Sequence, residues 1–266
     1  MMYRLFDHYL DWSKADVHLN KTTLLDEQNQ LIFEDALERL QQSVPLQYIT
    51  GNTQFIGLRL IVTPDVLIPR PETEELATLI LREQKDIKIA DLSFLDIGTG
   101  SGCLALAMKD AFPKSDVTAI DNLRAALDIA RQNARKHQLQ INFMVADILQ
   151  KSASRKLATF NIIISNPPYI PVSDKSQMHA NVVDHEPGSA LFVSDENPLL
   201  FYQYIANFSI KHLKQSGILY VEIHERFGQA CASLLQKTGF HNIEVLKDMQ
   251  DKDRFIRASE IIIPGC

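Results

Sequence analysis

The segment FNIIISNPPYIPV, residues 160–172, runs from an apolar stretch into an asparagine, two prolines and a tyrosine. An asparagine side chain offers one acceptor oxygen and two donor hydrogens. Proline has no N–H group, so we expect the carbonyl of Pro167 to lack a partner in a strand ladder. Asn166 and Pro167 could then accept both hydrogens of one –NH2 group, with Pro168 beside them and Tyr169 as a flat wall.

Such a clasp suits methylation of a nitrogen whose lone pair is delocalised, as in a carboxamide or an exocyclic base amine. Holding both N–H bonds favours pyramidalisation and aims the lone pair at a sulfonium methyl. Much of the rate would come from placement of the reacting atoms ~3 Å apart. The acceptors would ease the positive charge that develops on nitrogen. The alternative is a loop that only ends a strand, since Asn-Pro is a common turn signal.

A second candidate site is the glycine-rich segment LDIGTGSGCLALA, in which an apolar strand leads directly into a helix. Glycines permit a tight turn and close approach of a ligand, and the free N–H groups of the helix start point to the same place. The G-x-G-x-G spacing resembles the S-adenosyl-L-methionine loop of class I methyltransferases more than the dinucleotide pattern G-x-G-x-x-G. The loop residues that we expect to bind this cofactor are Gly98, Thr99, Gly100, Ser101 and Gly102.

Two carboxylates follow at later strand ends. Asp121 lies roughly twenty residues after the loop, where a carboxylate binds both ribose hydroxyls of an adenosine. Asp147 either accepts a hydrogen bond from the adenine amino group or caps a helix, and the sequence leaves both readings open. Ile148 would pack on the adenine ring. Asn166, at the end of the neighbouring strand, is expected to face the same crevice and to contact the cofactor as well.

These residues need a scaffold of strands that alternate with helices, which implies an α/β fold with a parallel sheet covered on both faces. The last two expected strands are joined by too short a link for a crossover helix, so they should form an antiparallel hairpin at one end of the sheet. The strand order is not predicted. Expected strands are 92–97, 116–121, 141–146, 159–165, 217–223, 242–247 and 254–262, and expected helices are 102–112, 122–138, 199–215 and 226–238.

The N-terminal part differs in pattern from the rest. Residues 1–50 show helical spacing and predict a small helical domain. Residues 51–70 contain short β-prone pieces between glycines and a proline, which predicts a β-hairpin linker. A methyltransferase domain over 71–266 would open on a helix at PRPETEEL, because proline and acidic residues suit a first helical turn.

Composition excludes several classes of protein. The chain has 266 residues and a net charge of −6, without the basic face of a nucleic-acid-binding protein, and Arg131, Arg135 and Lys136 read as a solvated helix face. Cys103, Cys231 and Cys266 match no metal-ligand spacing and read as idle thiols in a reducing compartment. No apolar run reaches the ~18 residues that a membrane helix needs. We expect a cytoplasmic monomer that binds no metal.

Several segments together resemble one family. NPPY after IIIS, with LDIGTGSG, VLIPRPETEEL and PLQYITG, is similar to the release-factor glutamine methyltransferases (the PrmC/HemK family) from about Leu5 to residue 262. HEP at 185–187, ALF at 190–192 and DKDRFI at 251–256 also resemble family segments. The resemblance implies a Rossmann-like seven-stranded class I methyltransferase domain, joined through a β-hairpin to a helical N-terminal domain.

The resemblance also implies the reaction. The family transfers methyl from S-adenosyl-L-methionine to the side-chain amide N5 of the glutamine in the Gly-Gly-Gln loop of class 1 peptide-chain release factors, and leaves S-adenosyl-L-homocysteine. Gly98 to Gly102, Asp121, Ile148 and Asn166 match its cofactor contacts, and Asn166 to Tyr169 match its substrate pocket. The chain departs from the family at a late start and at Asn197-Pro198, where a glycine-bearing DGL is usual.

Two other functions remain open from the sequence. An adenine-amino (N6) methyltransferase acting on DNA or RNA would use the same pocket, but would need a flipped or exposed base. A cofactor-binding scaffold for a translation factor would perform no chemistry. Glu72 and Glu74 are either helix-start charges or substrate contacts, and His224 is expected to be structural or at the rim of the site.

Overall fold

A computed structural model describes residues 2–85, 92–150 and 157–261. Cys266 and residue 262, the last position of the final expected strand, lie outside these ranges. The helices are α1 (Met2–Leu10), α2 (Lys14–Leu19), α3 (Glu27–Gln41), α4 (Leu46–Thr50), α5 (Pro71–Gln84), α6 (Cys103–Ala111), α7 (Arg124–Lys136), α8 (Ala180–Val183), α9 (Gly188–Leu191), α10 (Leu200–His212) and α11 (Gly228–Thr238), with a 3-10 helix η2 (Val172–Gln177).

The strands form one large sheet and two small pairs. The large sheet has seven strands in the order β10-β11-β9-β6-β3-β4-β5. The five strands from β9 to β5 run parallel, and β11 is antiparallel to both of its neighbours. The strands are β1 (Asn52–Phe55), β2 (Leu58–Ile61), β3 (Ser93–Ile97), β4 (Asp116–Asp121), β5 (Asn142–Val145), β6 (Phe160–Ser165), β7 (Ile170–Pro171), β8 (Phe192–Val193), β9 (Leu213–Glu222), β10 (Phe240–Lys247) and β11 (Asp253–Ile261).

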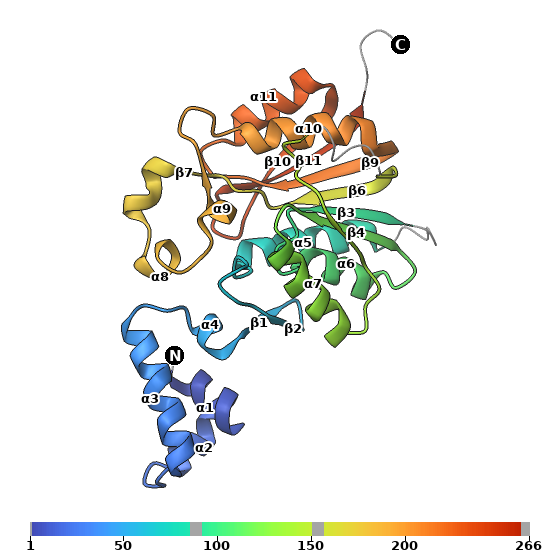
Figure 1. Ribbon diagram of the computed structural model, residues 1–266. Coiled ribbons are helices and arrows are strands. Elements are labelled where there is room, and N and C mark those ends of the chain that lie inside the picture. Colours follow the sequence, from blue (N-terminus) through green and yellow to red (C-terminus); the bar gives the residue numbers. More distant parts are fainter. Residues whose placement is uncertain (1, 86–91, 151–156, 262–266) are drawn as a thin grey trace.

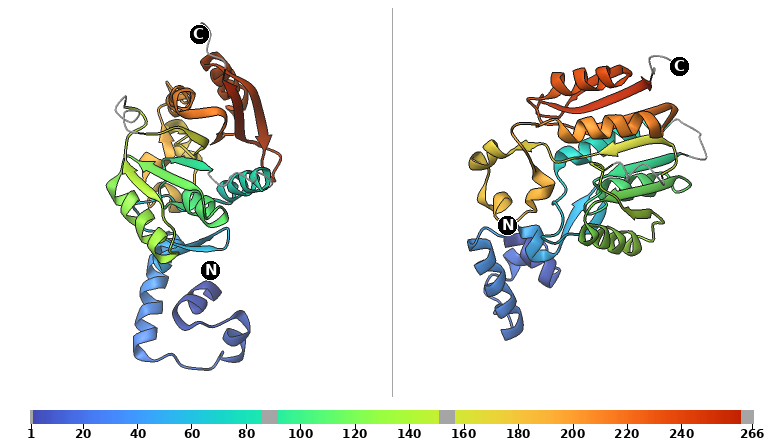
Figure 2. Two further views of the ribbon diagram at one scale, coloured as in Figure 1. Left: turned by 90° about the vertical axis from the view of Figure 1, so that its right-hand side faces the viewer. Right: turned by 45° about the horizontal axis from the view of Figure 1, so that its top comes forward.

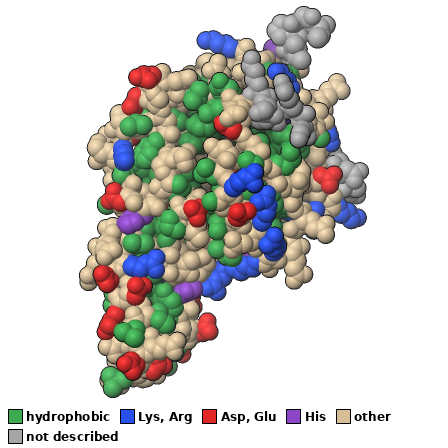
Figure 3. All heavy atoms as spheres, viewed as in Figure 1, with side chains coloured by type: hydrophobic (Ala, Val, Ile, Leu, Met, Phe, Trp, Pro, Cys, Tyr) green, Lys and Arg blue, Asp and Glu red, His purple; other side chains and the backbone are tan. Residues whose placement is uncertain are grey.

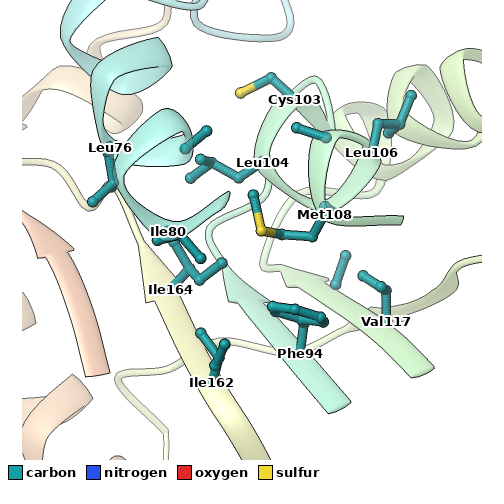
Figure 4. Close-up of a cluster of buried hydrophobic side chains, with 14 of the residues drawn as sticks. Leu76, Ile80, Phe94, Cys103, Leu104, Leu106, Met108, Val117, Ile162 and Ile164 are labelled. Carbon is teal, nitrogen blue, oxygen red and sulfur yellow. The ribbon is translucent and has the colours of Figure 1, made fainter. Parts of the chain in front are cut away.

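This architecture confirms the expected α/β fold, including the terminal antiparallel hairpin of β10 and β11. Figure 1 shows α5, α6 and α7 on one side of the sheet and α10 and α11 on the other. Successive side chains of a strand point to opposite faces, so the central strands are apolar throughout. Phe94 of β3 packs under α5 and α6 with Leu76 and Met108 (Figure 4), whereas its neighbour Leu95 packs with Tyr202 of α10.

The four N-terminal helices have a core of their own. Leu5 of α1, Phe33 and Ala36 of α3, and Leu46 and Ile49 of α4 bury one another away from the sheet. Figure 2 shows these helices beyond one side of the sheet, connected to it through the hairpin. β1 and β2 pair antiparallel, as expected for this segment.

The hairpin is fixed to the sheet domain by one buried asparagine. Asn133 of α7 is fully buried, accepts a hydrogen bond from the Ile61 N–H at 2.6 Å and donates to the Ile61 carbonyl at 3.0 Å. Its Nδ2 also donates to the carbonyl of Ser101 at 2.9 Å. One amide thus links the hairpin, α7 and the glycine-rich segment.

The segment after β6 contains elements that the sequence did not reveal. β7 pairs in parallel with β8, and η2, α8 and α9 lie between them. The intervening helices are short and lack a clear apolar period, which is the signal that identifies a helix in a sequence. This insert follows directly after Tyr169 and lies beside the carboxyl ends of the central strands (Figure 1).

The surface carries both signs of charge. Figure 3 shows Lys and Arg side chains gathered near α7 and the hairpin, and Asp and Glu over much of the N-terminal helices. Arg131 pairs with Asp128, and Lys136 donates to the carbonyl of Arg59, so part of the basic cluster has partners within the chain. No helix in the described ranges has both the length and the hydropathy to cross a membrane.

Candidate functional site

A cavity opens at the carboxyl ends of β3, β4 and β6, the edge of a parallel sheet at which ligands bind. It contains about 810 Å³ of atom-free space including its mouth. Its lining combines the glycine-rich segment, the ends of the next two strands, the Asn-Pro-Pro segment and apolar side chains. Those apolar residues include Val66, Leu123, Ile148, Phe201 and Ile205.

The three glycines of the glycine-rich segment have two different surroundings: two line the cavity, and one packs against neighbouring side chains. Gly98 and Gly100 line the cavity, both with a positive φ (73° and 54°) and with open space where a Cβ would stand. Gly102 starts α6 with φ 85°, and a Cβ there would lie 2.6 Å from Cδ1 of Leu106. Gly102 is therefore needed for packing of α6 against its neighbours.

Thr99 and Ser101 are buried between these glycines. The Thr99 hydroxyl donates to Asp96 at 2.6 Å, and the Ser101 carbonyl accepts from Asn133. Neither side chain is among those that line the cavity. We still predict that the cofactor contacts Thr99, Ser101 and Gly102, but through their backbone groups.

Asp121 lines the same cavity at the end of β4. Its carboxylate accepts from the Gly100 N–H and from the Leu123 N–H, both at 2.9 Å, which fixes the side chain on the glycine-rich segment. Burial raises the pKa of Asp121, and the backbone N–H groups oppose that rise. Carboxylate oxygens accept more than one hydrogen bond, so Asp121 keeps the capacity to bind hydroxyl groups in the cavity.

Asp147 and Ile148 also line the cavity. Asp147 accepts from the N–H of Leu149 at 2.9 Å and from Gln150 at 3.2 Å, which makes it the first residue of a tight turn. Asp147 thus begins a turn and not a helix within the described residues, and its contact with an adenine amino group stays a prediction, because Asp147 also lines the cavity. Ile148 supplies an apolar wall next to it.

A second, smaller cavity lies against the first. It contains about 600 Å³ of atom-free space including its mouth, and it is lined by Arg70, Tyr169, Ile170, Met178, Val182 and Leu191 together with four residues of the first cavity. The four shared residues are Leu67, Asn166, Pro167 and Ala190. Asn166 and Pro167 are thus part of the wall between the two spaces, whereas Pro168 lines only the first and Tyr169 only the second.

A chain of hydrogen bonds holds the amide of Asn166. Its Nδ2 donates to Oγ1 of Thr73 at 3.0 Å, and the Thr73 hydroxyl donates to Oε2 of Glu222 at 2.8 Å. The Tyr169 hydroxyl donates to the other oxygen of Glu222 at 2.9 Å. Burial, with the charge of Glu222, raises the pKa of Tyr169 well above its ordinary value.

Two buried carboxyl groups were not anticipated as site residues. Glu222 ends β9 with no exposed surface, and burial raises its pKa to about 7. Burial also raises the pKa of Asp96, in the middle of β3, to about 7, although Thr99 and the Ala105 N–H donate to it. A carboxylate inside an apolar strand, as in GILYVEI and SFLDI, is the sequence signal that could have identified both.

The sequence left the roles of three residues undecided, and the structure places each in different surroundings: Glu72, Glu74 and His224. Glu74 accepts from the Ile56 N–H in the turn of the hairpin, so it is a structural contact. Glu72 lies half-buried near Glu222, whose pKa it raises. His224 lies 3.6 Å from Asp174, with its pKa lowered by burial, at the side of the insert.

The segment before α5 is tied to the insert by a buried ion pair. Glu186 pairs with Arg70, and it also accepts from the Ile68 N–H at 3.1 Å. The Glu186 side chain is only 1% exposed. This contact sets the position of Leu67 and Arg70, which line the second cavity.

In the described ranges no group of three or more His, Cys, Asp and Glu side chains fits a metal ion. The polar lining of the first cavity includes instead three carboxylates (Asp65, Asp121 and Asp147), backbone groups of a glycine loop and the amide of Asn166, framed by apolar walls. That set fits an adenosine-bearing ligand, because ribose hydroxyls need acceptors and an adenine ring needs apolar faces.

Comparison with known proteins agrees with this geometry. A family model described as "Methyltransferase small domain" matches residues 76–186, and one described as "PrmC N-terminal domain" matches residues 2–51. Among solved structures, a methyltransferase from Pyrococcus furiosus is similar with a TM-score of 0.57 at 17% identity, over 86% of this chain and 99% of that chain. The T. thermophilus 16S rRNA N2 G1207 methyltransferase, solved with AdoMet and guanosine, has the same TM-score and identity over 79% of this chain and 49% of its own.

The curated relatives share one name. A release factor glutamine methyltransferase of Flavobacterium psychrophilum is 39% identical over 97% of this chain and 90% of its own length. Those of Bacteroides thetaiotaomicron (39% identity, 92% and 86% covered) and Streptococcus pneumoniae (41%, 90% and 82%) are similarly close. The sheet has the class I methyltransferase fold, and the chain belongs to the release factor glutamine methyltransferase family.

Proposed function

We propose that this protein methylates the side-chain amide N5 of the glutamine in the Gly-Gly-Gln motif of class 1 peptide-chain release factors. S-adenosyl-L-methionine would be the methyl donor, and S-adenosyl-L-homocysteine and N5-methylglutamine would be the products. The observation that carries the proposal is the position of Asn166 and Pro167 between the two cavities. Family membership supports the substrate over a nucleic-acid base.

The first cavity would hold the cofactor. Asp121 would accept the ribose hydroxyls, Gly98 to Gly102 would approach the ligand through their backbone, and Asp147 and Ile148 would contact the adenine ring. When bound, S-adenosyl-L-methionine supplies an electrophilic methyl group on a sulfonium. Asn166 would contact both this ligand and the substrate.

The second cavity would hold the glutamine side chain. Oδ1 of Asn166 and the carbonyl of Pro167 would accept the two amide hydrogens, while Pro168 and Tyr169 shape the space around the planar group. These acceptors hold the nitrogen in place and ease the charge that develops on it. One proton then leaves the nitrogen for solvent, so no strong base is needed before attack.

We propose three parts for the chain: a helical substrate-recognition domain over 1–50, a β-hairpin linker over 51–70 and a methyltransferase domain over 71–266. The separate core of the first helices supports this division. We also propose that the protein acts as a monomer in the cytoplasm, without stable binding to nucleic acid, where it meets newly made release factors.

The test is to incubate the protein with methyl-labelled S-adenosyl-L-methionine and either a purified class 1 release factor or RNA and DNA. We expect label on the release factor alone, and none on a factor whose Gly-Gly-Gln glutamine is replaced by alanine. Label on nucleic acid and none on the factor would reject the proposal in favour of an adenine-amino methyltransferase. An Asn166→Ala protein that supports normal cellular function would instead indicate a non-enzymatic scaffold.

A further inference from the structure

We propose that Thr73 and Glu222 are positioning residues that hold the Asn166 amide with its Oδ1 toward the substrate cavity. This inference rests on the proposed function of Asn166 as an acceptor for the glutamine amide. It goes further because Thr73 and Glu222 lie behind the cavity wall, outside the residues that line either cavity.

The three groups come from separate parts of the fold. Thr73 lies in the first turn of α5, Glu222 ends β9, and Asn166 follows β6. Thr73 is 2% exposed and Glu222 is fully buried, so water does not compete for their hydrogen bonds. The two links measure 3.0 Å and 2.8 Å, both within the normal range for hydrogen bonds.

The direction of each hydrogen bond follows from the chemistry of Glu222. An ionised carboxylate only accepts, so the Thr73 hydroxyl must donate to it. The Thr73 oxygen then has only lone pairs to offer to Asn166, and it selects the –NH2 end of the amide. The oxygen end, Oδ1, is left to face the cavity.

The opposite orientation of Asn166 would break this chain. Its Oδ1 would have to accept from Thr73, and Oε2 of Glu222 would lose the hydroxyl that donates to it. Loss of a donor to a buried carboxylate is costly. The acceptor that the substrate needs is therefore preset before the substrate arrives, which reduces the reorganisation needed for transfer.

The charge of Glu222 changes near neutral pH, because burial raises its pKa to about 7, so the chain of hydrogen bonds described above is that of its ionised form. The charged guanidinium of Arg254 and the hydroxyls of Thr73 and Tyr169 favour the ionised form, whereas burial and the charge of Glu72 oppose it. The titratable or charged groups that face Glu222 are Glu72 of α5, Cys103 of α6, Tyr169, Tyr202 of α10 and Arg254 of β11.

The experiment compares Thr73→Val, which removes the hydroxyl at nearly constant volume, with Thr73→Ser, which keeps it. Thr78→Val, at an exposed position of the same helix, is the matched control. We measure kcat and KM with a release factor, and the Kd for S-adenosyl-L-methionine by calorimetry. Thr73→Ala, which adds no bulk, replaces the valine variant if that variant does not fold.

We expect kcat of Thr73→Val to fall about 10- to 100-fold, the scale of a misplaced contact in an active site. KM and the cofactor Kd should stay within about twofold, and Thr73→Ser should restore kcat. Unchanged kcat in Thr73→Val, or an equal loss in Thr73→Ser, would overturn the inference, because the hydroxyl would then have no role.

A second readout does not depend on activity. The side-chain –NH2 signals of Asn166, assigned by their loss in Asn166→Asp, should shift in Thr73→Val and stay in place in Thr73→Ser. Signals that do not move in Thr73→Val would overturn the relay even if the release factor proves not to be the substrate. A wild-type protein that leaves the release factor unlabelled would reject the proposed function alone.

Discussion

Asn133 and Ile61 are paired like residues of neighbouring strands, although one is a helix side chain and the other is backbone in a hairpin. The amide accepts from the Ile61 N–H at 2.6 Å and donates to the Ile61 carbonyl at 3.0 Å, and it also reaches the Ser101 carbonyl. A buried side chain that satisfies three backbone groups is hard to replace, because each group loses its partner with it.

Replacement of Asn133 by leucine should therefore lower the free energy of unfolding by about 2–4 kcal/mol, through unsatisfied backbone groups. Urea denaturation followed by circular dichroism measures this loss. Gln132→Ala, at an exposed position of the same helix, is the control and should change little. A stability equal to that of the control would show that the hairpin is held mainly by apolar packing.

Gly102→Ala should destabilise the protein more than Gly57→Ala. Both glycines have a positive φ (85° and 77°), which strains any residue with a Cβ, but only Gly102 has neighbours where the methyl would go. We expect about 1 kcal/mol of strain at each site, with about 1–3 kcal/mol more at Gly102 from overpacking. Thermal unfolding of the two variants side by side tests this, and equal losses would refute the packing role of Gly102.

Asn166→Asp should keep cofactor binding and lose turnover by orders of magnitude. The carboxylate can accept hydrogen bonds, but it has no –NH2 group for Thr73 and adds a negative charge near buried Glu222 and near the cofactor sulfonium. Calorimetry with S-adenosyl-L-methionine and a labelling assay with a release factor separate the two effects. Near-normal turnover would contradict the role given to the amide.

Glu222 should make stability depend on pH. Burial raises its folded pKa to about 7 from 4.5, so between these values the folded state binds more protons than the unfolded state. Stability from this group is present below about pH 4.5 and is lost as pH rises toward 7. The Glu222→Gln variant has no carboxyl group to titrate at this position. The free energy of unfolding of the variant minus that of the wild type should therefore rise by up to about 3 kcal/mol from pH 4.5 to pH 8.

Urea titrations of both proteins at several pH values measure this difference. A constant difference across the range would mean that Glu222 is ionised in the fold throughout, which would place its pKa near the ordinary value. Asp96 titrates in the same direction, and since both proteins retain it, its contribution cancels in the comparison.

Arg70→Ala should destabilise the insert around the second cavity. It would leave Glu186, with 1% of its side chain exposed, without its cation. We expect a loss of about 2 kcal/mol, below the value for a fully buried pair because the arginine is partly exposed. Lys247→Ala removes an exposed ion pair with Asp251 and should have no measurable effect. Limited proteolysis of the 172–192 segment, with urea denaturation, reports both changes.

The sequence predicted every strand of the large sheet to within a few residues, because apolar runs separated by turn signals are local features. It predicted Asp121 and Asn166 at one crevice, because parallel strands bring their carboxyl ends to the same edge. The insert after Tyr169 was missed, since its helices are short and lack a clear period. The strand order also depends on contacts that no local pattern encodes.

Glu222 and Thr73 show what sequence reasoning could not reach. They lie 149 positions apart, and each has an ordinary local explanation, as a strand end and as a helix start. Only their shared contact reveals that they act on one asparagine. The same limit applies to Gly102 and Ser101. Their spacing predicts contact with a cofactor, and only the fold reveals that Gly102 also lets α6 pack closely and that the Ser101 carbonyl accepts from Asn133.

The shared wall of the two cavities has a consequence for the order of events. Most of the lining of each space belongs to it alone, and only Leu67, Asn166, Pro167 and Ala190 serve both. If the methyl donor and the glutamine occupy these spaces as proposed, each can bind while the other is in place. A single molecule that linked an adenosine to a glutamine-like tail across that wall would fill both cavities at once. Such a molecule would be a natural starting point for a bisubstrate inhibitor.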